Sequence, residues 1–219
     1  MKQEIDLLID YPKAKRNVEE RGAGKTEEDR AIARQFGKEF FDGDRRNGYG
    51  GFNYFPRFWQ PVIPTLQQHF GLTAASSVLD VGCAKGFMLH DLAALIPGIT
   101  VKGLDVSAYA IEHAIDDMQQ HVQVADARHL PFEDKSFDVV ISINTVHNLN
   151  RADCAQALRE IERVSKGKSY ITVDAYRSEE EKIRMFAWNL TAQTIMSVDE
   201  WKAFFDEVGY TGDYFWFIP

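Results

Sequence analysis

The chain has 219 residues, of which 45% are apolar and 26% are charged, and its formal net charge is −8. This composition excludes a disordered or collagen-like chain, and the negative charge argues against a nucleic-acid partner, because a phosphate backbone would be repelled. Residues 1–60 carry 12 basic and 11 acidic side chains, so the remainder of the chain holds a net charge of −9.

Aromatic residues gather toward the two ends of the chain. Nine lie between Phe36 and Trp59 and eight between Trp201 and Phe217, whereas only five lie between Val78 and Ala175. The two cysteines form no metal-ligand pattern with the six histidines and are too few for a disulfide framework. No apolar run is long enough to span a membrane and the N-terminus lacks signal-peptide features, so we expect a cytoplasmic protein without a metal site.

The first 70 residues predict an N-terminal arm, a helix and an aromatic lid. Residues 1–25 are polar and read as a loose arm, and residues 27–41 have helical apolar spacing behind a capping pair, Thr26 and Asp29. Residues 42–53 are rich in turn formers, and residues 57–70 predict a short helix with prolines near its start.

Residues 71–219 predict an α/β domain in which strands alternate with helices. Strands are expected at residues 77–81, 100–105, 122–125, 137–143, 168–175 and 210–218, and helices at 87–96, 108–118, 151–165 and 197–208, with a further polar helix after Tyr176. This alternation favours a doubly wound, mainly parallel sheet of six to seven strands, covered by helices on both faces and capped by the N-terminal helix.

Polar residues follow four of these strands at their carboxyl ends. A glycine turn, Gly82-Cys83-Ala84-Lys85-Gly86, comes directly after Asp80 and Val81, and glycines in such a turn let the backbone approach a ligand. Asp105, Asp126 and Asn144 follow the next three strands, and an acid at Asp105 can accept hydrogen bonds from both hydroxyls of a ribose. Doubly wound folds bind ligands at this edge of the sheet.

These stretches resemble the motifs of class I S-adenosylmethionine-dependent methyltransferases. Asp80–Gly86 resembles the first motif of the family, Asp/Glu-x-Gly-x-Gly-x-Gly, and Gly103–Ser107 resembles its second acidic motif. Ala125–Phe132 resembles the adenine-side motif, and Phe137–Val140 with Asn144–His147 resembles the fourth-strand motif. The resemblance covers about residues 77–175, with the motifs in the family's order. A nicotinamide-binding Rossmann protein is the neighbouring interpretation, but its Gly-x-Gly-x-x-Gly pattern is absent.

The resemblance implies S-adenosylmethionine as cofactor and S-adenosylhomocysteine as product. Gly82 and Gly86 would border the methionine moiety, Asp80 its amino group, Asp105 the ribose and Asp126 the adenine amino group. The residues that it implies for cofactor binding are Asp80, Gly82, Cys83, Ala84, Gly86, Asp105, Val106, Asp126, Ala127 and Asn144.

Three departures from the family pattern stand out. Ala84 replaces the middle glycine, and its methyl group fits unless φ there is positive. Lys85 brings a cation into the turn, where we expect a solvated or carboxylate-pairing surface charge. The family's terminal hairpin is missing, because only residues 210–218 remain after the last helix. We therefore expect six strands or a rearranged edge, and an exposed edge would invite a homodimer.

The sequence shows no catalytic motif as strong as its cofactor site. Methyl transfer from a sulfonium mainly requires alignment of the acceptor and exclusion of water, and a general base is needed only if the acceptor must lose a proton. His147 is the candidate base, with a histidine that merely caps the strand end as the structural alternative. Candidate substrate-binding residues lie in the lid and beyond the strand ends, namely Tyr49, Tyr54, Arg57, Trp59, Asn148 and Tyr176.

The aromatic residues of the lid have a purely structural interpretation as well, because they would also dock the N-terminal helix on the sheet. We expect methyl transfer to a small-molecule acceptor held between the strand ends and this lid. Three alternatives stay open. One is an enzyme of the same fold that uses S-adenosylmethionine for cyclisation or decarboxylation, another is a cofactor-binding subunit without catalytic activity, and the third is the nicotinamide-binding enzyme.

Overall fold

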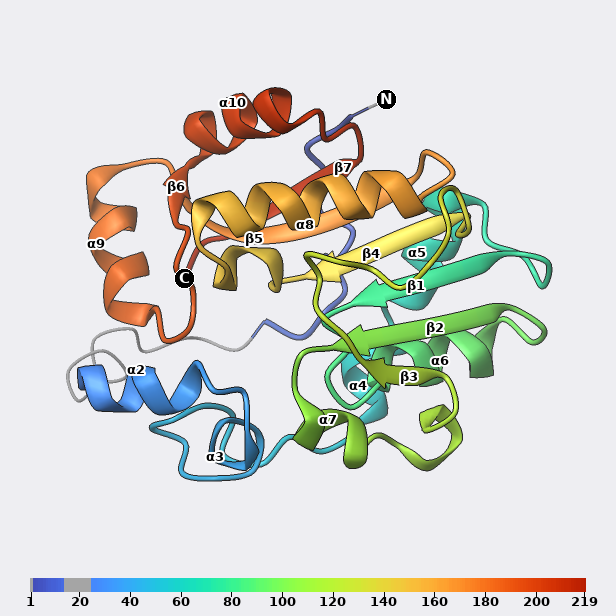
Figure 1. Ribbon diagram of the computed structural model, residues 1–219, viewed down its shortest axis with the longest axis horizontal. Coiled ribbons are helices and arrows are strands. Elements are labelled where there is room, and N and C mark those ends of the chain that lie inside the picture. The colour runs from blue at the N-terminus through green and yellow to red at the C-terminus, as the bar shows by residue number, and fades with distance from the viewer. Residues whose placement is uncertain (1, 14–24) are drawn as a thin grey trace.

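The computed structural model describes residues 2–13 and 25–219, which form a central seven-stranded sheet between two layers of helices (Figure 1). All strand pairs are parallel; the order is β3-β2-β1-β4-β5, and both β6 and β7 pair with β5. The strands are β1 Ser77–Val81, β2 Thr100–Asp105, β3 Val122–Val124, β4 Val139–Ile143, β5 Ser169–Tyr176, β6 Met196–Ser197 and β7 Asp213–Phe217. The predicted doubly wound, parallel α/β fold is confirmed.

Helices cover both faces of this sheet. They are α2 Glu27–Ala33, α3 Lys38–Phe41, α4 Pro56–Trp59, α5 Ile63–Phe70, α6 Phe87–Leu95, α7 Ala108–Glu112, α8 Arg151–Val164, α9 Glu179–Trp188 and α10 Val198–Val208, with short 3-10 turns η1 Asp116–Met118 and η2 Val146–Asn148. Leu158 of α8 and Trp201 of α10 lie in the core on one face, and Leu66 of α5 and Leu89 of α6 lie in the core on the other. Within the described ranges, no helix has the length and apolar character needed to cross a membrane.

Three of the predicted helices are divided. The first cap helix breaks between α2 and α3 because Phe36 takes a left-handed φ of +49°, after which Gly37 begins a new helix. The second breaks between α4 and α5, where Pro61 has no N–H to donate and Pro64 opens the next helix. The predicted helix 108–118 ends at α7, and its remainder forms η1.

The sheet edge at β7 is rearranged, which is one of the two outcomes that the sequence predicts. β7 runs parallel to β5, and its outer edge is occupied by the chain's own N-terminal residues. Ile5 N donates to the carbonyl of Tyr214 at 3.0 Å, and Tyr214 N donates to the carbonyl of Gln3 at 2.9 Å. The rearranged edge, which the sequence predicts as the alternative to six strands, is therefore confirmed, and the possible homodimer stays a prediction.

The same contacts correct the expectation of a loose arm. Residues 2–13 are packed, since Leu7 is buried and its N–H donates to the hydroxyl of Tyr170. The rest of that arm, residue 1 and residues 14–24, lies outside the described residues.

Candidate active site

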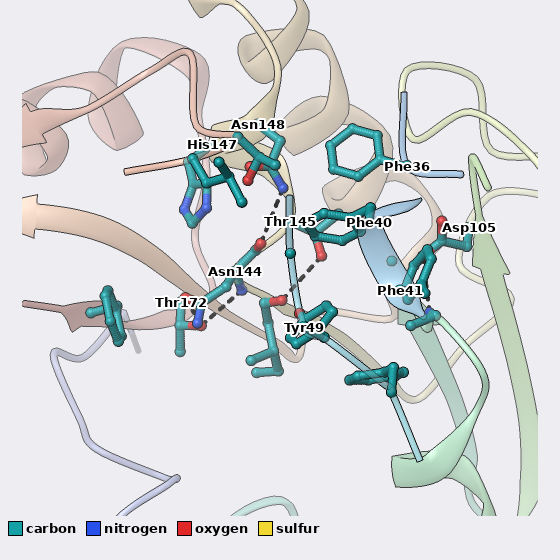
Figure 2. A pocket seen from close by; sticks show the side chains of 18 of the residues that line it. Phe36, Phe40, Phe41, Tyr49, Asp105, Asn144, Thr145, His147, Asn148 and Thr172 are labelled. Carbon is teal, nitrogen blue, oxygen red and sulfur yellow. Dashed lines mark hydrogen bonds between the residues drawn. The ribbon is translucent and has the colours of Figure 1, made fainter. Parts of the chain in front are cut away.

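A large pocket opens at the carboxyl ends of the parallel strands. In Figure 1 the arrowheads of β1, β2 and β4 point toward the side where α2, α3 and α9 lie. The pocket has a volume of about 1700 Å³. It is lined by the strand ends, by the aromatic residues between Phe36 and Trp59, which we call the aromatic cap, and by the segment after α9. Figure 2 shows aromatic side chains of the cap, including Phe36, Phe40 and Tyr49, beside the strand-end residues Asn144 and His147. This is the place where doubly wound folds bind ligands.

The glycine turn after β1 has a left-handed backbone at three positions. Gly82, Ala84 and Gly86 have φ values of +88°, +49° and +79°. A Cβ atom at Gly82 would lie 2.1 Å from Oγ1 of Thr145, so no larger residue fits there without displacing the loop after β4. Because φ of Ala84 is positive, its methyl group does not fit the turn without strain. An L-residue with left-handed backbone costs about 1–2 kcal/mol.

Two carboxylates lie beneath this turn, that of the buried Asp80 and that of the half-buried Asp105. Asp80 is 5% exposed, and burial together with the neighbouring charge of Asp105 raises the pKa of Asp80 to about 8. Burial also raises the pKa of Asp105, although its carboxylate accepts hydrogen bonds from Ala84 N at 2.9 Å and Ser107 N at 2.8 Å. No basic side chain of the described residues forms an ion pair with either acid.

This pair of acids fits a cationic ligand. Two carboxylates that share a buried site repel each other, and a positive charge placed between them relieves that repulsion and favours ionisation of both. S-adenosylmethionine carries a sulfonium and an ammonium group, so the electrostatics of the turn match the cofactor that the sequence implies. Cys83 in the same turn is buried, which raises the pKa of its thiol well above the ordinary value and keeps it protonated.

The adenine-side positions also line the pocket. Val106 is 59% exposed, and both Val106 and Ala127 line the pocket. The carboxylate of Asp126 is held by the guanidinium of Arg128, with Nη2 2.5 Å from Oδ2, and this hydrogen bond lowers the pKa of Asp126. Asp126 therefore has an intramolecular partner that the sequence did not predict.

The residues after β4 form the polar floor of the pocket. Asn144 has a left-handed φ of +51°, and its Oδ1 accepts a hydrogen bond from Thr172 Oγ1 at 2.9 Å. His147 is buried, and its Nδ1 accepts a hydrogen bond from the backbone N–H of Asp174 at 2.9 Å. Burial lowers the pKa of His147, so the ring is uncharged near neutral pH. Asn148 lines the pocket beside them.

The cap brings most of the predicted substrate residues to the pocket. Tyr49, Tyr54, Arg57 and Trp59 all line it, but several are committed to other contacts. The hydroxyl of Tyr54 donates to Asp91 Oδ1 at 2.6 Å, and burial followed by this hydrogen bond raises the pKa of Tyr54 to about 12. The guanidinium of Arg57 lies over the rings of the neighbouring cap residues Phe55 and Phe58.

Tyr176 does not belong to the pocket lining. Its hydroxyl lies 3.4 Å from Glu200 Oε2, on the side of the β5 end that faces α10. The position of Tyr176 does not support its predicted role in substrate binding. Pocket-lining side chains that the sequence did not single out include Phe36, Phe40 and Gln193.

Lys85 joins the glycine turn to the cap. It is buried, and its Nζ lies 2.6 Å from Asp42 Oδ2 and 2.9 Å from the carbonyl oxygen of Phe52. Asp42 also accepts hydrogen bonds from Phe52 N and from the hydroxyl of Tyr109, both at 2.8 Å. The predicted pairing with a carboxylate is confirmed, but the predicted surface location is wrong, since no local pattern links a lysine of the turn to an acid 43 residues earlier.

Known proteins resemble this chain over its central part. Residues 79–173 match a family model described as a methyltransferase domain. The tRNA (carboxymethyluridine(34)-5-O)-methyltransferase of Arabidopsis thaliana is 31% identical over 147 residues, which cover 65% of this chain and 33% of that protein. The 27-O-demethylrifamycin SV methyltransferase of Amycolatopsis mediterranei is 27% identical over 154 residues, which cover 63% of this chain and 55% of that protein. The chain thus spans a third to about half of the length of these relatives.

A solved structure shares the fold as well. The YcgJ protein of Bacillus subtilis aligns over 67% of this chain and 66% of its own, with a TM-score of 0.55 and 22% identity. The segment matched by the family model contains the glycine turn, the acids Asp80 and Asp105, and the strand-end residue Asn144. Residues 79–173 are therefore similar to a methyltransferase domain, and this similarity supports the class I S-adenosylmethionine-dependent methyltransferase family that the sequence motifs resemble.

Proposed function

We propose that this protein transfers a methyl group from S-adenosylmethionine to a small-molecule acceptor held between the strand ends and the aromatic cap. The observation that carries the proposal is a pair of acids beneath the glycine turn, the buried Asp80 and the half-buried Asp105, with no basic side chain of the described residues paired to them. S-adenosylmethionine supplies an activated methyl group when bound, so the protein's main tasks are alignment and exclusion of water.

In this proposal, different residues bind different parts of the cofactor. Asp105 accepts hydrogen bonds from the ribose hydroxyls with the lone pairs that Ala84 N and Ser107 N leave unused. Asp80 compensates the positive charge of the methionine moiety. Val106 provides an exposed apolar surface for the adenine ring, beside Ala127.

The size and the lining of the pocket favour a sizeable acceptor of low molecular mass. Its volume of about 1700 Å³ exceeds the roughly 300–1,000 Å³ common for a single drug-sized ligand, so a second ligand has room beside the cofactor. Aromatic residues of the cap supply an apolar wall against which the acceptor can pack. One relative's name points to rifamycin chemistry and another's to tRNA. The net charge of −8 favours the small molecule over the nucleic acid.

Two further candidate functions make different products. Cyclisation or decarboxylation chemistry on the same cofactor would release methylthioadenosine or decarboxylated cofactor, whereas methyl transfer releases S-adenosylhomocysteine. A subunit without catalytic activity would bind the cofactor but give neither product over a broad panel of acceptors. Chromatography of the nucleoside products after incubation with S-adenosylmethionine separates all three.

Calorimetric titration with S-adenosylhomocysteine tests the cofactor site directly. Asp105→Ala should weaken binding by about 2–4 kcal/mol, since two hydrogen bonds to a charged acceptor contribute about 1–2 kcal/mol each. Asp116→Ala, which removes an exposed acid outside the pocket, is the matched control and should bind like the wild type. Because Asp105 also holds two backbone N–H groups, circular dichroism must first show that the variant is folded. Unchanged affinity in a folded Asp105→Ala protein would rule out the assignment.

A further inference from the structure

The ring of His147 is fixed between two backbone segments. It lies on η2, directly after β4, and its Nδ1 accepts the N–H of Asp174 in β5 at 2.9 Å. The backbone carbonyl of His147 in turn accepts hydrogen bonds from the N–H groups of Gln193 and Thr194, at 3.0 and 2.9 Å. The ring is 3% exposed, so it has little freedom to turn.

These contacts determine which ring nitrogen carries the proton. A backbone N–H that points at Nδ1 needs a lone pair there, and a neutral imidazole has a single N–H, which must then be on Nε2. Burial favours the neutral ring, whereas the carboxylate of Asp174, with Oδ1 3.9 Å from Nδ1, acts in the opposite direction. With Nδ1 occupied by a donor and Nε2 already protonated, the neutral ring has no free lone pair with which to accept a proton.

The Nε2–H group is left for a ligand. His147 lines the pocket, and in the described part of the chain no hydrogen-bond acceptor is paired with its Nε2. A second donor lies close by on the same loop (Figure 2). Thr172 Oγ1 accepts from Asn144 N and donates to Asn144 Oδ1, which orients the amide so that its NH₂ group is turned away from Thr172. The floor of the pocket therefore presents N–H donors.

We infer that His147 holds an oxygen of the acceptor through Nε2–H and does not remove the acceptor's proton. This inference rests on the proposed function. It favours an acceptor that bears a hydrogen-bond-accepting oxygen, such as a carbonyl or carboxylate oxygen, within reach of Nε2–H, because such oxygens accept an N–H donor. In the transfer, the acceptor's lone pair forms the bond to the methyl carbon and the S–CH₃ electron pair returns to sulfur. Any proton on the attacking atom passes to solvent, and His147 keeps its own.

Nuclear magnetic resonance of the ¹⁵N-histidine-labelled protein tests the inference without any acceptor. Long-range ¹H–¹⁵N correlations should show His147 protonated at Nε2 and bare at Nδ1 at neutral pH, with a titration midpoint below the value near 6.5 of an ordinary histidine. The signal is assigned by its loss in His147→Gln. A proton on Nδ1, or a titration midpoint near 6.5, would overturn the inference.

Two variants separate a donor from a base in turnover. The probe is a panel of aromatic carboxylic acids, each with its methyl ketone and its primary alcohol, assayed with S-adenosylmethionine labelled in the methyl group. His147→Gln restores an N–H donor near the Nε2 position and should keep kcat/KM within about fivefold, whereas His147→Ala should raise KM about tenfold, as expected for one lost hydrogen bond. His121→Gln, outside the pocket, is the control.

The two proposals fail in different ways. If Gln and Ala variants both lose about 10² or more in kcat together with the acidic limb of the pH–rate profile, His147 is a base and the inference is overturned. An Ala variant with unchanged KM for every substrate would also overturn it. If the wild-type protein does not bind S-adenosylhomocysteine, the proposed function fails. The nuclear magnetic resonance experiment still decides the protonation state of His147, because it does not require any member of the panel to be methylated.

Discussion

The contact between Lys85 and the cap leads to a quantitative prediction. Lys85→Met keeps the length of the side chain but removes the charge that binds Asp42 and the carbonyl of Phe52. Because Lys85 belongs to the glycine turn and both partners belong to the cap, the change should loosen the cap locally and leave the central sheet intact. Tyr54, which donates to Asp91 in α6, holds the cap at a second point and limits the opening.

The size of the effect follows from burial. Removing one partner of a fully buried ion pair costs about 3–5 kcal/mol, because the other charge remains without compensation. The Asp42 side chain is 22% exposed, against 8% for Lys85, and keeps hydrogen bonds from Phe52 N and Tyr109. We therefore expect a loss of about 2 kcal/mol, which corresponds to about 30-fold faster exchange in the cap, at 1.4 kcal/mol for each factor of ten.

Hydrogen exchange measured by mass spectrometry on peptides from residues 38–55 provides the assay. Lys102→Met is the matched control, because it removes a lysine of β2 that forms no ion pair within the described residues. A double-mutant cycle with Asp42→Asn should return a coupling energy of about 1–2 kcal/mol. If peptides of the cap exchange in Lys85→Met as they do in Lys102→Met, the cap does not depend on this contact and the reasoning is refuted.

Further predictions concern the turn and its acids. Because the pKa of Asp80 is raised to about 8, the ligand-free protein holds this proton at neutral pH, and binding of the ammonium group of S-adenosylhomocysteine should release it. Calorimetry should show that the affinity for S-adenosylhomocysteine rises with pH up to about 8, by at most tenfold per pH unit. Asp80→Asn should abolish this pH dependence, and its absence in the wild type would contradict the assignment of Asp80 to the ammonium group. The unfolded acid ionises near its ordinary pKa of 3.8, so Asp80 also lowers stability as pH rises from about 4 to about 8, a loss that urea titrations of Asp80→Asn should lack. Ala84→Gly should stabilise the protein by about 0.5–1 kcal/mol in urea unfolding, because relief of the left-handed strain exceeds the entropic cost of glycine. Gly86→Ala should destabilise it by about 1–2 kcal/mol, since its Cβ would lie 3.1 Å from that of Met118 at a φ of +79°, and equal effects of the two changes would disprove the strain argument.

The central sheet and the cofactor positions could be predicted because their signals are local. Buried parallel strands read as short runs of Val, Ile and Leu, and the turn of Gly82 and Gly86 and the acid Asp105 follow directly after such runs. Parallel pairing then brings these strand ends to one edge, whatever the detailed packing. The alternation of strands and helices therefore predicts from the sequence alone that Asp80 and Asp105 lie close together.

Tertiary structure alone decided the features that depend on distant partners. The salt bridge from Lys85 to Asp42, the N-terminal residues beside β7 and the commitment of Tyr54 to Asp91 each join segments far apart in the sequence, where no periodic pattern records the contact. The protonation of His147 is of the same kind. The sequence placed a histidine after β4 and allowed a base, but the donor that occupies Nδ1 is a backbone N–H of β5, and only folding brings it there.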